Sequence, residues 1–109
     1  MELIDRDELK EKLDRGETFK LVMVLGGWAF RAKHIPGSIN VSTPDEVAEM
    51  LAPEDEIVVY CSNEACPASP FAYRLLTASG YANVRRYAGG LADWEAAGYP
   101  IEGEAADQS

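Results

Sequence analysis

Ile57-Val58-Val59-Tyr60-Cys61 predicts a buried β-strand that ends on a cysteine, because three of its residues are β-branched and a fourth is aromatic. The sequence continues with Ser62-Asn63-Glu64-Ala65-Cys66-Pro67-Ala68-Ser69-Pro70, which predicts a loop that leads into a helix. Ser69 is a typical N-cap, and Pro70 is a typical first helical residue. Ligands bind beyond the carboxyl ends of strands in open α/β sheets, and a helix N-terminus stabilises anions and thiolates. The stretch therefore predicts a nucleophilic sulfur beside an anion-binding loop.

Strands and helices alternate on both sides of this stretch. Capping boxes at Asp5–Glu8 and Thr43–Glu46 predict two helix starts, with the first helix stopping at Gly16 and the second at Pro53. The remaining elements are strands expected over 21–25, 38–41 and 84–88, one or two helical turns over 28–33, and helices over 70–79 and 91–97. Strands separated by helices at this spacing predict an α/β domain, with a mostly parallel sheet and helices on both of its faces.

Composition limits the classes of partner. The 109 residues suffice for one domain, expected over 1–101, and the small polar residues that follow predict a disordered tail over 102–109. The net charge of −9 disfavours nucleic acid and anionic membranes as partners. No apolar run approaches the roughly 18 residues of a membrane span, and residues 1–5 lack the form of a signal peptide, so we expect a cytoplasmic protein.

Two cysteines and one histidine limit the metal and disulfide chemistry of the chain. They are too few for a disulfide scaffold or for a four-ligand structural zinc site, and His34 is distant in sequence from both cysteines. We therefore expect no metal and no cofactor. His34 is interpreted as a hydrogen-bonding residue of its turn.

Four segments of the chain form a set that carries a family resemblance. They are the apolar strand Leu21–Leu25, the turn His34-Ile35-Pro36-Gly37-Ser38-Ile39-Asn40, the strand Val58-Val59-Tyr60-Cys61, and the C-terminal stretch from Gly80-Tyr81-Ala82-Asn83-Val84 to Tyr87-Ala88-Gly89-Gly90-Leu91-Ala92-Asp93-Trp94-Glu95-Ala96-Ala97-Gly98-Tyr99-Pro100. In this order and at these intervals the segments resemble the single-domain rhodanese-like family, over nearly all of the chain. The resemblance implies a small α/β fold around a parallel five-stranded sheet with helices on both faces.

The resemblance also implies a reaction. A rhodanese-type sulfurtransferase would take sulfane sulfur from thiosulfate or a persulfide donor onto Cys61, as a persulfide, and pass it to a thiol or protein acceptor. The residues themselves favour this chemistry, which needs a thiol of lowered pKa and N–H donors around a charged terminal sulfur. The loop expected to form this anion cradle comprises Ser62, Asn63, Glu64, Ala65, Pro67, Ala68 and Ser69.

The loop departs from the usual pattern of the family. It is longer, and it contains no arginine, since Ala68 stands where relatives often carry one. A sulfonate would therefore lack a bidentate cation in the loop. Met23 and Leu25 also replace charged residues that relatives carry in the first core strand. We therefore expect low activity with thiosulfate.

Cys66 places a second thiol in the same loop, five residues after Cys61. One hypothesis is a resolving thiol that attacks a Cys61 persulfide or sulfenic acid, releasing sulfide or closing a disulfide. The other is a small apolar residue that packs the loop against the core. Three functions stay open at this point: a sulfurtransferase, a two-thiol redox or persulfide-handling protein, and a non-catalytic rhodanese-like binding module.

The rim of the pocket is predicted from residues outside the loop. Trp28 and Phe30 follow a double glycine and are candidates for it, with packing as the alternative. Arg31 and Arg74 are candidate cations near the pocket, with a solvated surface position as the alternative. Trp94 is expected in the core rather than at a binding surface.

Overall fold

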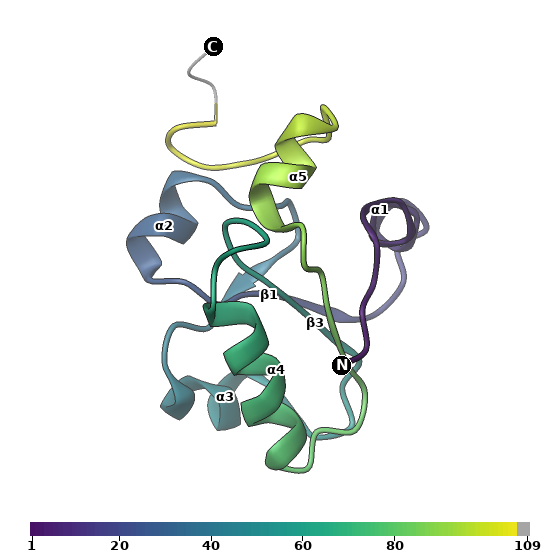
Figure 1. The fold of residues 1–109 in the computed structure, drawn as a ribbon, viewed down its shortest axis with the longest axis vertical. Helices are drawn as coiled ribbons and strands as arrows, with labels where there is room; N and C mark the ends of the chain where they lie inside the picture. Colours follow the sequence, from purple (N-terminus) through teal and green to yellow (C-terminus); the bar gives the residue numbers. More distant parts are fainter. Residues whose placement is uncertain (107–109) are drawn as a thin grey trace.

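Four parallel strands form a single sheet in the computed structural model, which describes residues 1–106 (Figure 1). The strands are β1 (Lys20–Met23), β2 (Ile39–Asn40), β3 (Ile57–Tyr60) and β4 (Val84–Arg86), in the order β2-β1-β3-β4. Strand β3 pairs with β1 on one side and with β4 on the other. Cys61, the residue after β3, therefore lies at the carboxyl edge of the sheet with a paired strand on each side.

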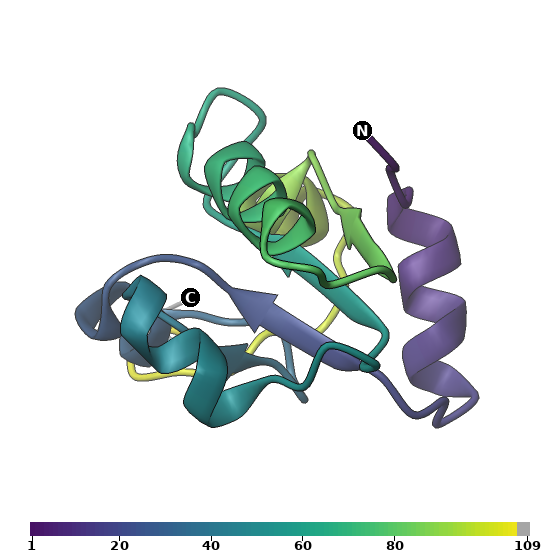
Figure 2. The same ribbon diagram turned by 90° about the horizontal axis from the view of Figure 1, so that it is seen from below.

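Helices cover both faces of this sheet. They are α1 (Arg6–Asp14), α2 (Gly27–Ala32), α3 (Pro44–Met50), α4 (Ala68–Ala78) and α5 (Gly90–Ala96). Figure 2 shows α1 on one side of the strands and α3 and α4 on the other. The predicted α/β architecture, a parallel sheet flanked by helices, is confirmed, although α4 begins two residues earlier than the predicted Pro70.

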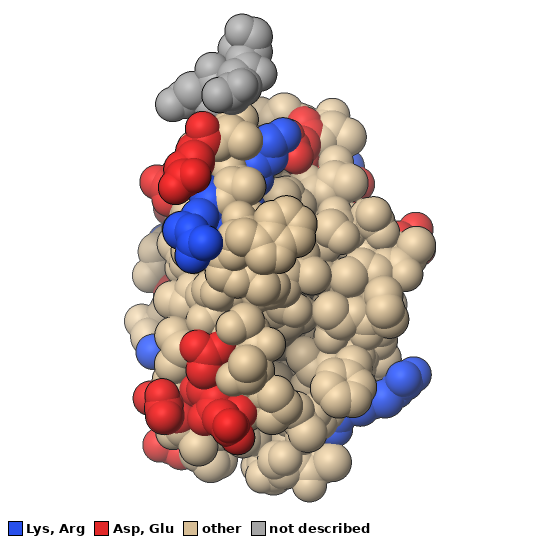
Figure 3. Space-filling view, turned by 90° about the vertical axis from the view of Figure 1, so that its left-hand side faces the viewer, with Lys and Arg blue, Asp and Glu red and all other residues tan. Residues whose placement is uncertain are grey.

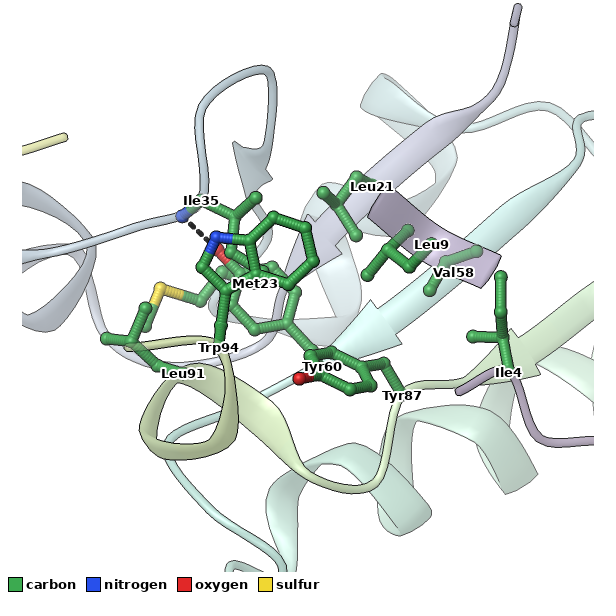
Figure 4. Close-up of a cluster of buried hydrophobic side chains, with 10 residues drawn as sticks. All are labelled: Ile4, Leu9, Leu21, Met23, Ile35, Val58, Tyr60, Tyr87, Leu91 and Trp94. Carbon is green, nitrogen blue, oxygen red and sulfur yellow. Dashed lines mark hydrogen bonds between the residues drawn. The ribbon is translucent and has the colours of Figure 1, made fainter. Parts of the chain in front are cut away.

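Strand β3 is apolar at every position because it is buried on both faces of the sheet. Successive side chains of a strand point to opposite faces, and here each face is covered by helices. Val58 and Tyr60 belong to the cluster that also contains Leu9 of α1 and Trp94 of α5 (Figure 4). Ile57 and Val59 belong to a second cluster, which Leu76 of α4 and partly buried Val47 of α3 also join. Trp94 is 1% exposed, so its predicted place in the core is confirmed.

The buried hydroxyl of Tyr60 ties the turn before β2 to the sheet. It accepts a hydrogen bond from the backbone N–H of Ile35 at 3.0 Å and lies 2.9 Å from Ser38 Oγ (Figure 4). Ser38 Oγ in turn donates to the Ile35 carbonyl at 2.6 Å. These bonds satisfy polar groups that would be costly to bury alone. The turn at residues 34–40, which carries part of the family resemblance, is therefore held to the sheet by hydrogen bonds to Tyr60.

The sheet has four strands, so the prediction of five was wrong in that respect. Beyond β4, Leu3 forms a single parallel bridge with Arg86. A longer strand is prevented because Asp5 already caps α1, its carboxylate accepting from the Glu8 N–H at 2.8 Å. The fifth strand is thus shortened to one bridge by the helix that follows it.

The chain after residue 101 returns to the end of α2. Glu102 and His34 exchange backbone hydrogen bonds of 2.8 and 2.9 Å, and the Ala105 N–H donates to the Ala32 carbonyl at 2.9 Å. Residues 102–106 of the expected disordered tail therefore have defined hydrogen bonds, and its remainder, 107–109, lies outside the described residues. No helix in residues 1–106 is long and apolar enough to span a bilayer.

Candidate active site

The backbone that leaves β3 is anchored by the first residues of α5. The N–H of Leu91 donates to the Cys61 carbonyl at 2.9 Å, and the N–H of Ala92 donates to the Ser62 carbonyl at 2.8 Å. Gly90 allows this approach, because its φ is +66° and a Cβ there would lie 2.5 Å from the Cys61 carbonyl oxygen. Cys61 is thereby fixed at the edge of the sheet, and only 1% of it is exposed.

The Cys61 sulfur is surrounded by polar groups of its own loop and of α4. The thiol faces the Cys66 carbonyl at 3.7 Å and the Asn63 carbonyl at 4.0 Å. Burial raises the pKa of Cys61, Cys66 raises it further, and Ser69 opposes both. The resting thiol is therefore protonated more readily than a free cysteine, and the Ser69 donors favour the thiolate once it forms.

Ser69 does not cap α4, so that part of the prediction was wrong. The helix begins at Ala68, after Pro67, with no side-chain cap. The Ser69 hydroxyl oxygen is buried and instead accepts a hydrogen bond from Nε of Arg86 at 2.8 Å. A hydroxyl that accepts from a guanidinium keeps its own proton free to donate. The Ser69 hydroxyl, held by Arg86, therefore acts to lower the pKa of Cys61.

Arg86 is the residue of this site that the sequence analysis missed. It lies on β4, where it pairs in register with Val59, two residues before Cys61. Its Nη2 also lies 3.5 Å from the Glu64 carbonyl, at the outer limit of a hydrogen bond. Neighbouring Arg85 forms a two-point ion pair with Glu8 instead. Alternation along the strand places the side chains of Arg85 and Arg86 on opposite faces of the sheet, and the partners of both are distant in sequence.

Cys66 lies beside Cys61 and is half-buried. The Cys61 thiol faces the Cys66 carbonyl oxygen at 3.7 Å. Burial acts to raise the pKa of Cys66, but hydrogen bonding from Cys61, Ala68 and Ser62 outweighs it, and the pKa is lowered.

The N–H groups at the tip of the predicted cradle bond within the loop. The Cys66 N–H donates to the Asn63 carbonyl at 3.2 Å, and the Ala65 N–H donates to Asn63 Oδ1 at 3.0 Å, closing a local turn. Asn63, Glu64 and Ala65 are exposed, as is Pro67, which has no N–H to donate. The loop amides that act to lower the pKa of one of the two thiols are those of Ser62, Ala68 and Ser69.

The four predicted rim residues lie on α2 and α4. Trp28 of α2 is 74% exposed, whereas Phe30 stacks on the His34 ring with 4.0 Å between centroids. Arg31 lies on α2, and Arg74 is exposed on α4. Within the described part of the chain, none of the four hydrogen-bonds to either cysteine, and their place at the rim stays a prediction. His34 Nδ1 lies 2.7 Å from the Phe30 carbonyl, as expected of a residue that holds its turn.

An apolar groove lies between α3 and α4. It has a volume of about 230 Å³ and includes Ala68 at the start of α4, but neither cysteine lines it. The middle of the face shown in Figure 3 is uncharged, and the Lys, Arg, Asp and Glu side chains lie toward its margins.

In residues 1–106, no group of three or more His, Cys, Asp and Glu side chains is placed to hold a metal ion.

Comparison with known sequences gives one family and one curated relative. The family model "Rhodanese-like domain" matches residues 5–97. The HTH-type transcriptional regulator Rv0324 of Mycobacterium tuberculosis is 35% identical over 102 residues, which are 91% of this chain and 44% of the regulator. The chain therefore spans less than half the length of that relative.

Solved structures show the same fold. The rhodanese-like domain of Alr3790 from Anabaena superposes with a TM-score of 0.88 at 27% identity, covering 100% of this chain and 84% of that one. The human single-domain sulfurtransferase TSTD1 superposes with a TM-score of 0.73, covering 88% of this chain and 96% of that one. Its identity to this chain is 24%, so this second likeness is one of fold.

Proposed function

The chain belongs to the rhodanese-like domain family, and from that premise we propose that it is a sulfurtransferase that carries sulfane sulfur on Cys61. One observation supports this most strongly: Cys61 directly follows β3, an inner strand of the sheet, and the N–H and the Arg86-bound hydroxyl of Ser69 both act to lower the pKa of its thiol. Two donors at one sulfur can stabilise a thiolate, and after loading they can stabilise a charged persulfide.

The proposed reaction has two steps. In the first, the Cys61 thiolate attacks the outer sulfur of a persulfide or thiosulfate donor. The S–S bond of the donor breaks, and its remaining part leaves with the electron pair as a thiolate or as sulfite. In the second, an acceptor thiolate attacks the outer sulfur of the Cys61 persulfide, takes that sulfur, and releases the Cys61 thiolate.

Charge favours a persulfide over thiosulfate as the donor. Arg86 is the cation nearest to this chemistry, but its Nε is already bonded to Ser69, 2.8 Å away. A sulfonate would therefore have to be held by few free donors, in a protein whose net charge is −9. A persulfide donor has no sulfonate group, so only its reacting sulfur has to be stabilised. The expected low activity with thiosulfate follows from the same arrangement.

The test is the intact mass of the protein after anaerobic treatment with glutathione persulfide or thiosulfate. Cys66→Ser should gain the mass of one sulfur atom, more readily from the persulfide, and Cys61→Ser, whose remaining thiol lacks the Ser69 donors, should gain much less. Cyanide should then remove the added sulfur as thiocyanate. An equal gain in Cys61→Ser, or no gain in Cys66→Ser, would contradict the proposal.

A non-catalytic module is the second candidate function. It is favoured by the relative in which a region similar to this chain makes up 44% of a transcriptional regulator. In such a module, the loop would recognise a sulfur-containing anion without transferring sulfur. Failure of every sulfur donor to modify Cys61, with the domain folded, would favour this candidate.

A further inference from the structure

We infer that Cys66 resolves the persulfide formed on Cys61, closing a disulfide between the two residues and releasing sulfide. The inference rests on the proposed function and extends it, because the released product becomes sulfide rather than a sulfane sulfur handed to an outside acceptor.

Closeness of the two cysteines is the first support. The Cys61 sulfur lies 3.7 Å from the Cys66 carbonyl oxygen, and both cysteines are free. An attack between two groups held in one loop loses little entropy on the way to its transition state.

The surroundings of Cys66 are those of a reactive thiol rather than of a packing residue. Cys66 joins neither of the two hydrophobic clusters in the described chain. The N–H and hydroxyl of Ser62 and the N–H of Ala68 instead act to lower the pKa of its thiol. Donors aimed at a sulfur favour its thiolate, which is the attacking form in thiol–disulfide exchange. A small apolar residue would need none of these contacts.

The two thiols are also held differently by the backbone. Cys61 is fixed by the bond from Leu91 to its carbonyl, at 2.9 Å. The Cys66 amide is held only within its own turn, by a 3.2 Å bond to the Asn63 carbonyl. Closing a disulfide requires the two sulfurs to approach to about 2.05 Å. The turn that carries Cys66 can make that movement while Cys61 stays in place.

The step balances as an intramolecular exchange. The Cys66 thiolate attacks the Cys61 Sγ, the bond from that sulfur to the outer sulfur breaks, and the outer sulfur leaves with the electron pair as hydrosulfide. The persulfide hydrogen goes with it. The two cysteine sulfurs are oxidised to a disulfide, and the sulfane sulfur is reduced to sulfide. A dithiol reductant then reopens the disulfide and is itself oxidised to a disulfide.

The experiment treats wild type and Cys66→Ser briefly with inorganic polysulfide under anaerobic conditions, desalts them, and follows intact mass. We expect wild type to lose two hydrogens and carry no added sulfur, with Cys61 and Cys66 linked in one peptide. Cys66→Ser should keep its added sulfur. With thiosulfate, whose other product is sulfite, wild type alone should release sulfide, up to one per chain.

A double variant serves as the matched control. Cys66→Ser combined with Ala65→Cys keeps two thiols in the loop but moves one away from its contacts, so its Cys61 persulfide should persist several-fold longer than in wild type. A persulfide equally long-lived in wild type and Cys66→Ser would overturn this inference and leave the sulfurtransferase proposal standing. If Cys66→Ser gains no sulfur, both the resolving role of Cys66 and the sulfurtransferase proposal are contradicted.

Discussion

The two ends of the loop after β3 are built differently. At its start, Cys61 and Ser62 are bonded through their carbonyls to Leu91 and Ala92 of α5, a segment distant in sequence. At its tip, Asn63, Ala65 and Cys66 bond mainly to one another. The start therefore gains its rigidity from the whole fold, and the tip depends on a local turn. A nucleophile that must be positioned lies at the rigid end, and the thiol proposed to approach it lies at the other.

Gly90→Ala should have the largest effect, because it acts on the rigid end. A Cβ at Gly90 would meet the Cys61 carbonyl oxygen at 2.5 Å, in a backbone conformation with φ of +66°. We expect a loss of roughly 2–4 kcal/mol in the free energy of unfolding, together with loss of sulfur loading on Cys61. Chemical denaturation and intact mass measure the two effects.

Gly98→Ala is its control. Gly98 has a φ of +78°, but a Cβ there would meet nothing within 4 Å. It should cost only about 1–2 kcal/mol and leave loading intact. Equal effects of the two substitutions would show that the contact between α5 and Cys61 is unimportant.

Ser69→Ala should have the next largest effect, on the chemistry rather than on the fold. It removes the hydroxyl that lowers the pKa of Cys61 and leaves Arg86 Nε without its partner. Because a lost hydrogen bond to a charged group costs roughly 1.5 kcal/mol or more, persulfide formation at neutral pH should slow roughly tenfold. Ser38→Ala is the control, since Ser38 bonds to Tyr60 and Ile35. The same slowing in Ser38→Ala would mean that stability, not the pKa, is responsible.

The pH dependence of alkylation distinguishes the two thiols directly. The pKa of Cys66 is lowered and that of Cys61 is raised, so as pH rises the thiolate appears on Cys66 first. Iodoacetamide should therefore label Cys66 several-fold faster than Cys61 at pH 7, with the difference narrowing above about pH 9. Peptide mapping by mass spectrometry gives both rates. Faster labelling of Cys61 at neutral pH would reverse the assignment.

Arg86→Gln should have the smallest of these effects, because Arg86 acts on Cys61 through Ser69. We expect persulfide formation to slow about threefold, with the pKa of Cys61 rising by less than in Ser69→Ala. Arg85→Gln lies one residue earlier on β4 and breaks the ion pair with Glu8 instead. It should leave the pKa of Cys61 unchanged. A thiolate absorbance titration of both variants, in a Cys66→Ser background, makes the comparison.

The sequence predicts where the helices and strands lie better than it predicts how far each extends and which residues it contacts. The apolar run at Ile57–Tyr60 and the capping box at Asp5–Glu8 carry local signals, and both elements are present. The number of strands was missed because Leu3 and Asp5 compete, one for the sheet and the other for α1. Local patterns identify each element but do not say which of two overlapping elements ends first.

In the candidate site, too, local sequence patterns identify residues but not their contacts with residues distant in sequence. Cys61 was found from the strand that precedes it, and Cys66 from its presence in the same loop. Arg86 was missed, because its contact with Ser69 spans 17 residues and depends on the pairing of β3 with β4. The capping role predicted for Ser69 was wrong for the same reason, since its hydroxyl is engaged by a residue that no local pattern places there.

A crystal structure of the polysulfide-treated Cys66→Ser variant tests the central claim most directly, since it shows where the sulfur is held. We predict electron density for one added sulfur atom on the Cys61 Sγ, within hydrogen-bonding distance of the Ser69 N–H and with α5 still bonded to the Cys61 carbonyl. An unmodified Cys61 in protein that has gained sulfur, or a persulfide pointing away from Ser69, would contradict the account.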